Sequence, residues 1–333
     1  MFSWFSYPKF WQTSNLLNFT LYPFCLIFYI LGIIRKISTS QIKLAYPIIC
    51  IGNASVGGCG KTRLIKALAH YYNAQQKRVI IVSKGYGSKL SGAVIVDSTI
   101  DDPLLVGDES IELATNFFGY KNILVIASRS PILAHNIIKK FAPDIILVDD
   151  GLQNPSFYKD FTILMIDGLR GFGNGLLIPA GPLRETKKSA LENDVLISLN
   201  PTDKILQEFS HLPKFYAIET NITLDAKDNS PALAFCGIGN PDNFFNMLKS
   251  KVLLIDWVVF PDHYSYKESD LEYIVKQADI ANAKVILTTE KDMSKITRLK
   301  NYDKRIISVK NSIDLNPLEP IIEKINERIF PKP

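Results

Sequence analysis

Residues 48–62 read IICIGNASVGGCGKT, and this stretch decides the fold. An apolar run typical of a buried strand passes into a glycine-rich turn, then Lys61 and Thr62, then a helix-like stretch from Arg63 to Tyr72. This order is the context of a Walker A loop, whose backbone N–H groups and helix N-terminus cradle phosphates. The usual pattern, G-x-x-x-x-G-K-(S/T), has Gly where this chain has Ser55.

The alternative is a chance Gly-Lys-Thr turn, but the strand and the helix on either side favour phosphate binding. We therefore expect Lys61 to reach the β- and γ-phosphates of a nucleotide and Thr62 to hold Mg²⁺. The residues predicted to bind the nucleotide are Ser55, Val56, Gly57, Gly58, Cys59, Gly60, Lys61 and Thr62.

The composition is that of a globular protein, with 47% hydrophobic and 21% charged residues. A length of 333 residues is sufficient for two domains. The net charge of +5 is mild and no nucleic-acid motif accompanies it, so we expect no nucleic-acid partner. Four cysteines without C-x-x-C spacing indicate no disulfide framework and fit a reducing compartment.

The N-terminal segment is unusually apolar, and residues 10–34 carry no charged side chain. The apolar run is just long enough to span a bilayer. A single span, a helix lying in the interface and a buried helix are all compatible with it, and its aromatic and basic flanks favour membrane attachment. Positive charge after the run, on Arg35, Lys36 and Lys43, places the following domain on the cytoplasmic side.

Beyond this segment, short apolar runs alternate with helical stretches, which is typical of an α/β fold with a mostly parallel sheet. The composition becomes polar and weakly patterned near residues 201–228, and a second alternating region follows. We expect a membrane-associated segment at 1–40, a P-loop nucleotide-binding catalytic domain at 41–215, and a smaller α/β domain at 216–333 that contributes to the active-site cleft.

Carboxylates stand at two informative positions. Asp149 and Asp150 follow the apolar run Ile145–Val148, as in a Walker B strand whose Asp holds Mg²⁺. An Asp-Gly turn is the alternative, and the Walker A loop favours the metal. Asp108 precedes a helix-like stretch, where it is either a helix cap or a general base for an acceptor hydroxyl. Spacing alone leaves both roles of Asp108 open.

Three weaker signals remain. The loop Gly173–Glu185 is rich in Gly and Pro, so Arg184 could clamp a phosphate and Glu185 could complete a metal shell. Adjacent Asp262 and His263 suggest acid–base chemistry, although spacing alone favours a structural role. Tyr86 either shapes a pocket or belongs to a turn.

Taken together, these motifs resemble the tetraacyldisaccharide 4′-kinase family, the lipid A 4′-kinases, in order from about Pro47 to Met293. Members commonly lack the first Gly of the Walker A loop, so Ser55 fits the family. Lys84 stands where the family usually has Arg, which keeps the charge and loses the planar fork, and Asn154 stands where it usually has His. The matching pieces are Gly52–Asn53, Ser55–Thr62, Ser83–Gly87, Val106–Glu109, Asp149–Gln153, Gly173–Glu185, Phe235–Pro241, Phe260–His263 and Thr289–Asp292.

The resemblance implies transfer of the γ-phosphoryl group of ATP, with Mg²⁺, to the 4′-hydroxyl of a tetraacyldisaccharide 1-phosphate. This is a step of lipid A, and hence lipopolysaccharide, biosynthesis. The resemblance also implies a monomer at the bacterial inner membrane, with catalytic domains that face the cytoplasm and meet the lipid substrate at the membrane surface.

Residue roles follow from the same resemblance. It implies that Asp108 is the base and that His263 tunes or orients it. Asp149 and Asp150 would belong to the catalytic centre. The expected Mg²⁺ ligands are Thr62, Asp150 and Glu185, and the weaker substrate-contact candidates are Tyr86, Arg129 and Arg184.

A membrane-attached P-loop switch or partition-type ATPase is the competing class, and it would need only the first domain. A GTPase should also show Asn-Lys-x-Asp, which Thr289–Asp292 does not match. The second alternating region and the Asp-His element favour an enzyme. A dinucleotide oxidoreductase is excluded because Lys61 and Thr62 are not part of a G-x-G-x-x-G fingerprint.

Overall fold

The computed structural model describes residues 8–13, 15–85, 92–99, 101, 103–223, 230–239, 241–249, 251–262, 264–297, 299 and 302–331. The chain divides into two compact units. The larger, here called the P-loop unit, contains Pro8–Thr220 and Ile313–Pro333, and the second unit contains Asn221–Ser312. Each unit is described by itself.

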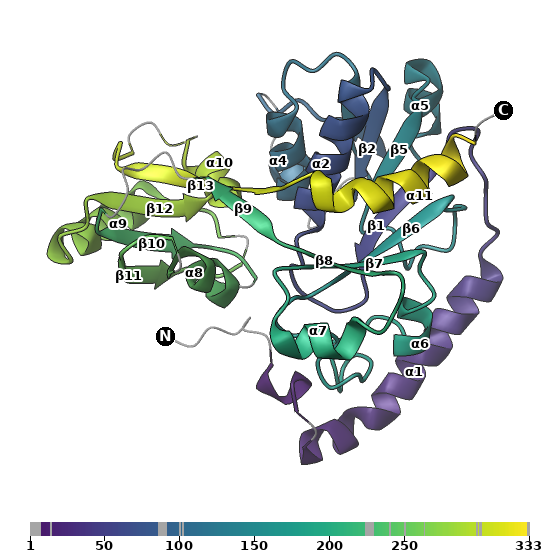
Figure 1. Ribbon diagram of the computed structural model, residues 1–333, viewed down its shortest axis with the longest axis horizontal. Helices are drawn as coiled ribbons and strands as arrows, with labels where there is room; N and C mark the ends of the chain where they lie inside the picture. The colour runs from purple at the N-terminus through teal and green to yellow at the C-terminus, as the bar shows by residue number, and fades with distance from the viewer. Residues whose placement is uncertain are drawn as a thin grey trace. The chain divides into compact units, whose positions relative to one another are not determined.

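The P-loop unit is built on an eight-stranded sheet with the order β3-β4-β2-β5-β1-β6-β7-β8 (Figure 1). Its neighbouring strands are parallel except for β3, which is antiparallel to β4. This confirms the predicted α/β, mostly parallel architecture. The strands are β1 (Ile48–Asn53), β2 (Val79–Ser83), β3 (Ala93–Ile95), β4 (Ile123–Ser128), β5 (Ile145–Asp149), β6 (Phe161–Ile166), β7 (Val195–Leu199) and β8 (Phe215–Ile218).

Helices cover both faces of this sheet, so the central strands β1, β2 and β5 are buried at every position and mostly apolar. Ile49 and Ile51 of β1 point into one core, shared with α2 (Lys61–Ala74) and α4 (Asp108–Asn116). Ile48 and Cys50 point into the opposite core, shared with α5 (His135–Phe141). The short helices α3 (Pro103–Val106), α6 (Lys187–Ala190) and α7 (Asp203–Phe209) complete this part of the unit.

Strand register brings the two phosphate-site motifs together. Ile51 of β1 pairs with Asp149 at the end of β5, and the backbone N–H of Asp150 donates to the Ile51 carbonyl at 2.8 Å. The glycine-rich loop begins directly after Asn53, at the end of β1. Ligands of open parallel sheets bind outside the carboxyl ends of the strands, so this edge is where a site is expected.

The second unit has a five-stranded sheet with the order β11-β10-β12-β13-β9. Pairs β10–β11, β10–β12 and β12–β13 are parallel. Apolar cores lie on both of its faces. Its elements are β9 (Thr220–Thr223), β10 (Ala232–Cys236), α8 (Pro241–Lys249), β11 (Leu254–Val259), α9 (Glu268–Ile280), β12 (Val285–Thr289), α10 (Glu290–Ile296) and β13 (Ile306–Ile313).

The end of the chain returns to the P-loop unit. After a 3₁₀ turn, η2 (Asn316–Leu318), helix α11 (Glu319–Ile329) buries Ile321, Ile322 and Ile325 in the core that also contains α2. The domain boundaries expected from the sequence placed α11 in the second domain, at residues 216–333. The structure places it with the P-loop unit. The amphipathic pattern of α11 identifies a helix with one apolar face, and it carries no information about which unit that face covers.

The N-terminal segment forms a 3₁₀ turn, η1 (Lys9–Trp11), and then the 23-residue helix α1 (Leu16–Ser38). By length and composition α1 is able to cross a membrane. Pro23 lies inside the helix, which continues past it. Asn18 and Cys25 are its buried side chains, whereas large apolar side chains along it are exposed, among them Leu16, Phe19, Ile27, Leu31, Ile34 and Ile37.

Candidate active site

The glycine-rich loop adopts a conformation that needs glycine at two positions. Gly57 has φ +117° and Gly60, which caps the N-terminus of α2, has φ +84°. Only glycine adopts this region readily. Ser55 does not have a positive φ, so glycine is not needed where the usual motif has it. The departure from the common pattern therefore leaves the loop shape intact.

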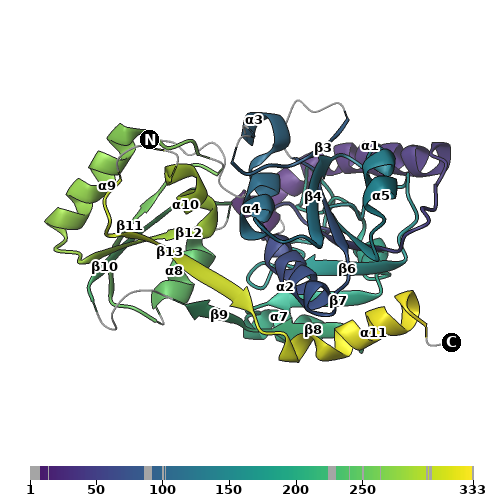
Figure 2. The same cartoon turned by 90° about the horizontal axis from the view of Figure 1, so that it is seen from above.

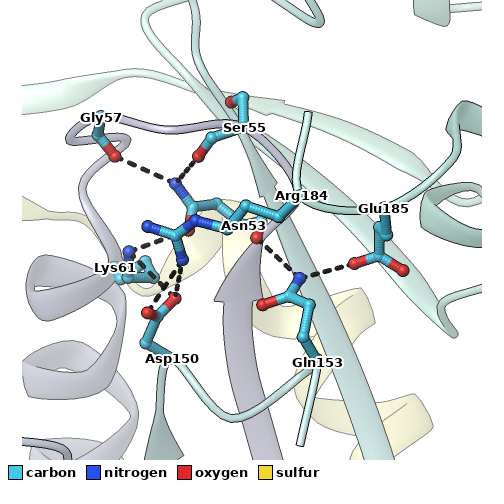
Figure 3. Close-up of polar contacts among 8 residues, drawn as sticks. All are labelled: Asn53, Ser55, Gly57, Lys61, Asp150, Gln153, Arg184 and Glu185. Atoms are coloured by element: carbon cyan, nitrogen blue, oxygen red, sulfur yellow. Dashed lines mark hydrogen bonds and ion pairs between the residues drawn. The ribbon is translucent and has the colours of Figure 1, made fainter. Parts of the chain in front are cut away.

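Asn53 holds this loop from within (Figure 3). Its side-chain amide donates to the carbonyls of Ser55 at 2.6 Å and Gly57 at 3.0 Å. Its Oδ1 accepts from Lys61 Nζ at 3.0 Å. The side chain is fully buried, so all three contacts are shielded from water. Sequence reasoning gave Asn53 no role. A polar amide at the end of an otherwise apolar strand was the available signal.

Lys61 and Arg184 share the carboxylate of Asp150. Lys61 Nζ lies 3.5 Å from Asp150 Oδ1, and Arg184 NH1 lies 3.1 Å and 2.9 Å from the two carboxylate oxygens (Figure 3). Burial acts to raise the pKa of Asp150, but Lys61, Arg184 and Lys84 outweigh it, so the pKa is lowered. Two cations around one carboxylate leave excess positive charge beside the phosphate loop.

The pKa of Lys61 is raised, although burial alone would lower it, because neighbouring acidic groups, Asp150 among them, favour the charged form. Lys61 is therefore an ammonium at neutral pH. Cys59, also in the loop, is a buried thiol whose pKa is raised to about 11 by that burial. The loop thus offers a fixed positive charge and no thiolate.

Asp149 is buried with unmet hydrogen-bonding capacity. It is 2% exposed, and neither carboxylate oxygen has a hydrogen-bond partner within the described residues. Burial, followed by the negative charge of Glu109, raises its pKa well above the ordinary value. A buried carboxylate without partners is costly, so it marks a functional position.

These residues fit Mg²⁺. That ion usually takes one or two carboxylates, and substrate phosphates and water supply its other ligands. Asp149 has free oxygens, Asp150 lies beside it, and Thr62 begins the neighbouring helix. Within the described residues there is no cage of three or more His, Cys, Asp or Glu side chains, which suits an ion held largely by a nucleotide.

Glu185 lies in a different environment from the one expected for a metal ligand. One of its carboxylate oxygens accepts from Gln153 Nε2 at 2.6 Å, and the other accepts from Ser189 Oγ at 2.7 Å. Gln153 also donates to the Asn53 carbonyl at 3.0 Å (Figure 3). The structure thus joins Glu185, through Gln153, to the support of the loop. Sequence reasoning gave Gln153 no role.

Asp108 is the first residue of α4, and the cap position belongs to Gly107, with φ +88°. The sequence left Asp108 as either a helix cap or a general base. Because Gly107 takes the cap position, the role of general base remains for Asp108. The negative charge of the next residue, Glu109, raises the pKa values of both Lys61 and Asp149. The N-terminus of α4 thus lies within electrostatic reach of the phosphate loop.

Of the remaining predicted residues, the structure describes Arg129. Arg129 follows β4 and is exposed, and its carbonyl accepts from Asn154 Nδ2 at 3.4 Å. Tyr86 and His263 lie outside the described residues. In the second unit, Asp262 forms an ion pair with Lys291 at 3.4 Å.

With this geometry established, comparison with known proteins is informative. The family model described as tetraacyldisaccharide-1-P 4′-kinase (LpxK) matches residues 17–329. The chain belongs to this family. The match extends across both units, whereas a nucleotide switch would need only the first. The predicted family and the predicted class, an ATP-dependent kinase, are confirmed.

Individual relatives agree along the whole length. A tetraacyldisaccharide 4′-kinase of Rickettsia canadensis is 40% identical over 330 residues, which are 98% of this chain and 97% of that protein. One of Rickettsia bellii is 41% identical over 294 residues, covering 87% and 89% of the two chains. The crystal structure of LpxK from Aquifex aeolicus in complex with ATP matches with a TM-score of 0.70 and 26% identity, over 95% of this chain and 100% of that one.

Proposed function

We propose that this chain transfers the γ-phosphoryl group of ATP to the 4′-hydroxyl of a tetraacyldisaccharide 1-phosphate, a step of lipid A biosynthesis, through the site built on Lys61, Asp150 and Asp108. The observation that carries the proposal is the Lys61–Asp150–Arg184 cluster beside the Asn53-held loop. Phosphoryl transfer needs positioning and charge neutralisation more than covalent chemistry, and this cluster supplies both.

Phosphate entry would exchange partners in this cluster. The 3.5 Å separation between Lys61 Nζ and Asp150 is longer than an optimal charged hydrogen bond, so an arriving phosphate can take over the lysine. Arg184 now contacts Asp150 through one nitrogen, NH1, so the rest of its planar guanidinium fork can contact a phosphate. The hydrogen bond from Lys61 to Asn53 limits where the ammonium can move.

Asp149, Asp150 and Thr62 are the residues that we assign to Mg²⁺. These residues would hold the ion, which would supply positive charge against the charge that develops on the transferred phosphoryl group. We assign Glu185 to the support of the loop and not to the metal. Gln153 and Ser189 each donate a hydrogen bond to one of its two carboxylate oxygens.

Asp108 is the proposed general base for the acceptor hydroxyl. A half-buried carboxylate at the start of a helix is stabilised in its charged form by the helix dipole, as a base must be. His263 of the second unit, outside the described residues, is the proposed partner that orients it. A kinase needs only one such carboxylate aimed at the hydroxyl proton.

We further propose that α1 lies in the membrane interface. Before and within the helix, Trp11 Nε1 donates to the Pro179 carbonyl at 2.9 Å and Asn18 Nδ2 donates to the Ala180 carbonyl at 2.6 Å. After it, the N–H of Ile42 donates to the Ser156 carbonyl at 2.9 Å. Both ends of α1 are thus attached to the same unit (Figure 1). A spanning helix would place them on opposite sides of a hydrocarbon core about 30 Å thick.

We propose a monomer bound to the cytoplasmic face of the bacterial inner membrane, where ATP is available and the acylated acceptor diffuses laterally. Labelling with a membrane-impermeant maleimide tests it, since Cys25, Cys50, Cys59 and Cys236 are buried. We expect Thr13→Cys and Ser40→Cys, both at exposed positions, to react from the same side of sealed vesicles. Reaction from opposite sides would establish a span.

The reaction is tested by transfer of label from γ-labelled ATP, with Mg²⁺, to purified tetraacyldisaccharide 1-phosphate in detergent micelles. The parent protein should label the lipid, and Asp108→Ala should lower the rate by orders of magnitude while ATP still binds. ATP hydrolysis by the parent without labelled lipid would favour the nucleotide switch. Full activity in Asp108→Ala would remove Asp108 from the reaction and leave the kinase in place.

A further inference from the structure

An ion pair joins the two helices whose N-termini form the proposed site. Lys66 Nζ on α2 donates to Glu112 Oε1 on α4 at 2.8 Å. The two side chains are 13% and 16% exposed, so water screens the pair only partly. Helices α2 and α4 contact each other and lie side by side in both views (Figures 1 and 2).

Each residue of the ion pair lies four positions after a residue of the proposed site. Lys66 is four residues after Thr62, and Glu112 is four residues after Asp108. Residues four apart lie on the same face of a helix, about one turn along its axis. The ion pair therefore lies one turn from the proposed metal ligand on one helix and one turn from the proposed base on the other.

A second cross-helix contact follows at the same spacing. His70 and Asn116 come four residues after Lys66 and Glu112, and His70 Nε2 lies 3.1 Å from Asn116 Nδ2. Burial, and then the charge of Lys66, lower the pKa of His70, which favours the neutral ring that can accept this hydrogen bond. We call the contacts Lys66–Glu112 and His70–Asn116 the α2–α4 ladder.

Helix α4 needs such contacts to have a defined position. It has nine residues, which is too short for independent stability, and it starts directly after Gly107 with its positive φ. Its apolar residues Ile111, Leu113 and Ala114 pack into the core. Apolar burial is non-directional, so it sets the distance between the helices better than their axial register. A hydrogen-bonded ion pair is directional and sets that register.

We propose that Lys66 and Glu112 are positioning residues for phosphoryl transfer, which hold the N-terminus of α4, and with it Asp108, in register with Lys61 and Thr62. Neither residue contacts the reacting groups in this account. The inference rests on the proposed role of Asp108. A mainly stabilising pair could be replaced by packed apolar side chains, whereas a positioning pair could not.

Steady-state kinetics of lipid phosphorylation test the inference with Lys66→Met, Glu112→Gln and the exchanged pair Lys66→Glu/Glu112→Lys. Each single variant should lower kcat by about tenfold or more, with KM for ATP within about threefold, because a small misplacement of a catalytic group acts on kcat. The exchanged pair should recover most of the lost kcat, and Lys66→Met/Glu112→Leu should not, even if it melts at the parent temperature.

The chain offers a matched control. Lys187 Nζ and Glu208 Oε1 are also 2.8 Å apart in the P-loop unit, with side chains 47% and 33% exposed. Lys187→Met and Glu208→Gln remove the same kind of pair from α6 and α7, which carry none of the proposed catalytic residues. Both should leave kcat unchanged.

Two results would overturn the inference. The first is parental kcat in folded Lys66→Met and Glu112→Gln proteins. The second is a parallel fall of kcat, ATP affinity and melting temperature, which describes a purely structural pair. Glu112→Gln keeps the side-chain volume and a hydrogen-bonding oxygen, so it decides the matter even if Lys66→Met does not fold. Failure of the parent to label the lipid would instead reject the proposed function, and this inference with it.

Discussion

The glycine-rich loop and helix α1 distribute polar and apolar side chains in opposite ways. Around the loop the buried side chains include the polar groups Asn53, Asp149 and Ser55, whereas on α1 most of the exposed side chains are apolar. Buried polar groups need a polar partner, and a large exposed apolar surface needs an apolar one. The buried polar groups agree with the proposed phosphate and Mg²⁺ site, and the exposed apolar side chains agree with the proposed membrane contact of α1.

The two regions also differ in how they are held. Hydrogen bonds from the side chains of Asn53 and Gln153, and from the backbone N–H of Arg184 to the Ala54 carbonyl, hold the loop and its start. Helix α1 is attached through contacts near its ends and through Asn18 and Cys25 on one face. Loop variants should consequently affect chemistry, and α1 variants should affect membrane binding.

Lys61→Ala should have the largest effect. The ammonium is the fixed positive charge of the loop, and removing one such electrostatic stabiliser typically lowers kcat by about 10²–10³-fold. Initial rates of lipid labelling at saturating ATP measure this. Flotation with anionic vesicles should be unchanged, because α1 is untouched. A kcat within threefold of the parent would remove Lys61 from the proposed mechanism.

Asn53→Ala should lower kcat by about 10- to 100-fold, because the loop and Lys61 lose the side chain that orients them. The effect should be smaller than that of Lys61→Ala, since the positive charge remains. Asn174→Ala is a matched control, because Asn174 Nδ2 also donates to backbone carbonyls but lies away from Lys61. Equal kcat losses in the two variants would contradict a specific role for Asn53.

Ile27→Glu/Ile34→Glu tests the other region. Both side chains are exposed on the part of α1 turned away from Cys25. In the proposed arrangement these two isoleucines insert into the membrane interface. Replacing both with Glu should weaken binding of the protein to vesicles by about 10- to 100-fold. ATP affinity should not change. Leu133→Glu is the control. Leu133 lies elsewhere on the P-loop unit, and its side chain is 54% exposed, as is that of Ile27. This variant should bind vesicles as the parent does. Equal loss in the control would reject α1 as the membrane contact.

Asn18→Ala should have the smallest effect. Its amide nitrogen donates to the carbonyls of Phe10 and Ala180, so both lose a buried partner. We expect the free energy of unfolding to fall by about 1–3 kcal/mol, as measured by urea denaturation. The kcat in detergent should stay near the parental value. A large fall in kcat without loss of stability would mean that α1 and the phosphate loop are coupled.

The sequence predicted the α/β architecture of the P-loop unit because its parallel strands are mostly apolar. The apolar run that begins at Ile48 corresponds to β1, and the run Ile145–Val148 corresponds to β5. Short elements with mixed composition, such as β8 and α7, have no periodic signal and were missed. The position of α11 was also missed, because its pattern reports an apolar face and not the surface that the face covers.

The site was less predictable than the fold. The Walker A and Walker B patterns identified Lys61, Thr62, Asp149 and Asp150, because these residues stand at fixed positions in recognisable sequence motifs. Asn53 and Gln153 act through contacts made only after folding, and an isolated amide gives no pattern. Glu185 was assigned to the metal from its place in a loop, and its two hydrogen bonds place it behind that loop. Such partners depend on three-dimensional proximity, which spacing does not encode.

The measurement that tests the account most directly is transfer of label from γ-labelled ATP to tetraacyldisaccharide 1-phosphate embedded in sealed anionic vesicles. The parent, Lys61→Ala and Ile27→Glu/Ile34→Glu are compared for lipid labelling, vesicle flotation and ATP binding. We predict that the parent labels the lipid, that Lys61→Ala floats without labelling it, and that the α1 variant binds ATP without floating or labelling. Parental labelling by the non-floating α1 variant, or no lipid labelling by the parent, would contradict the account.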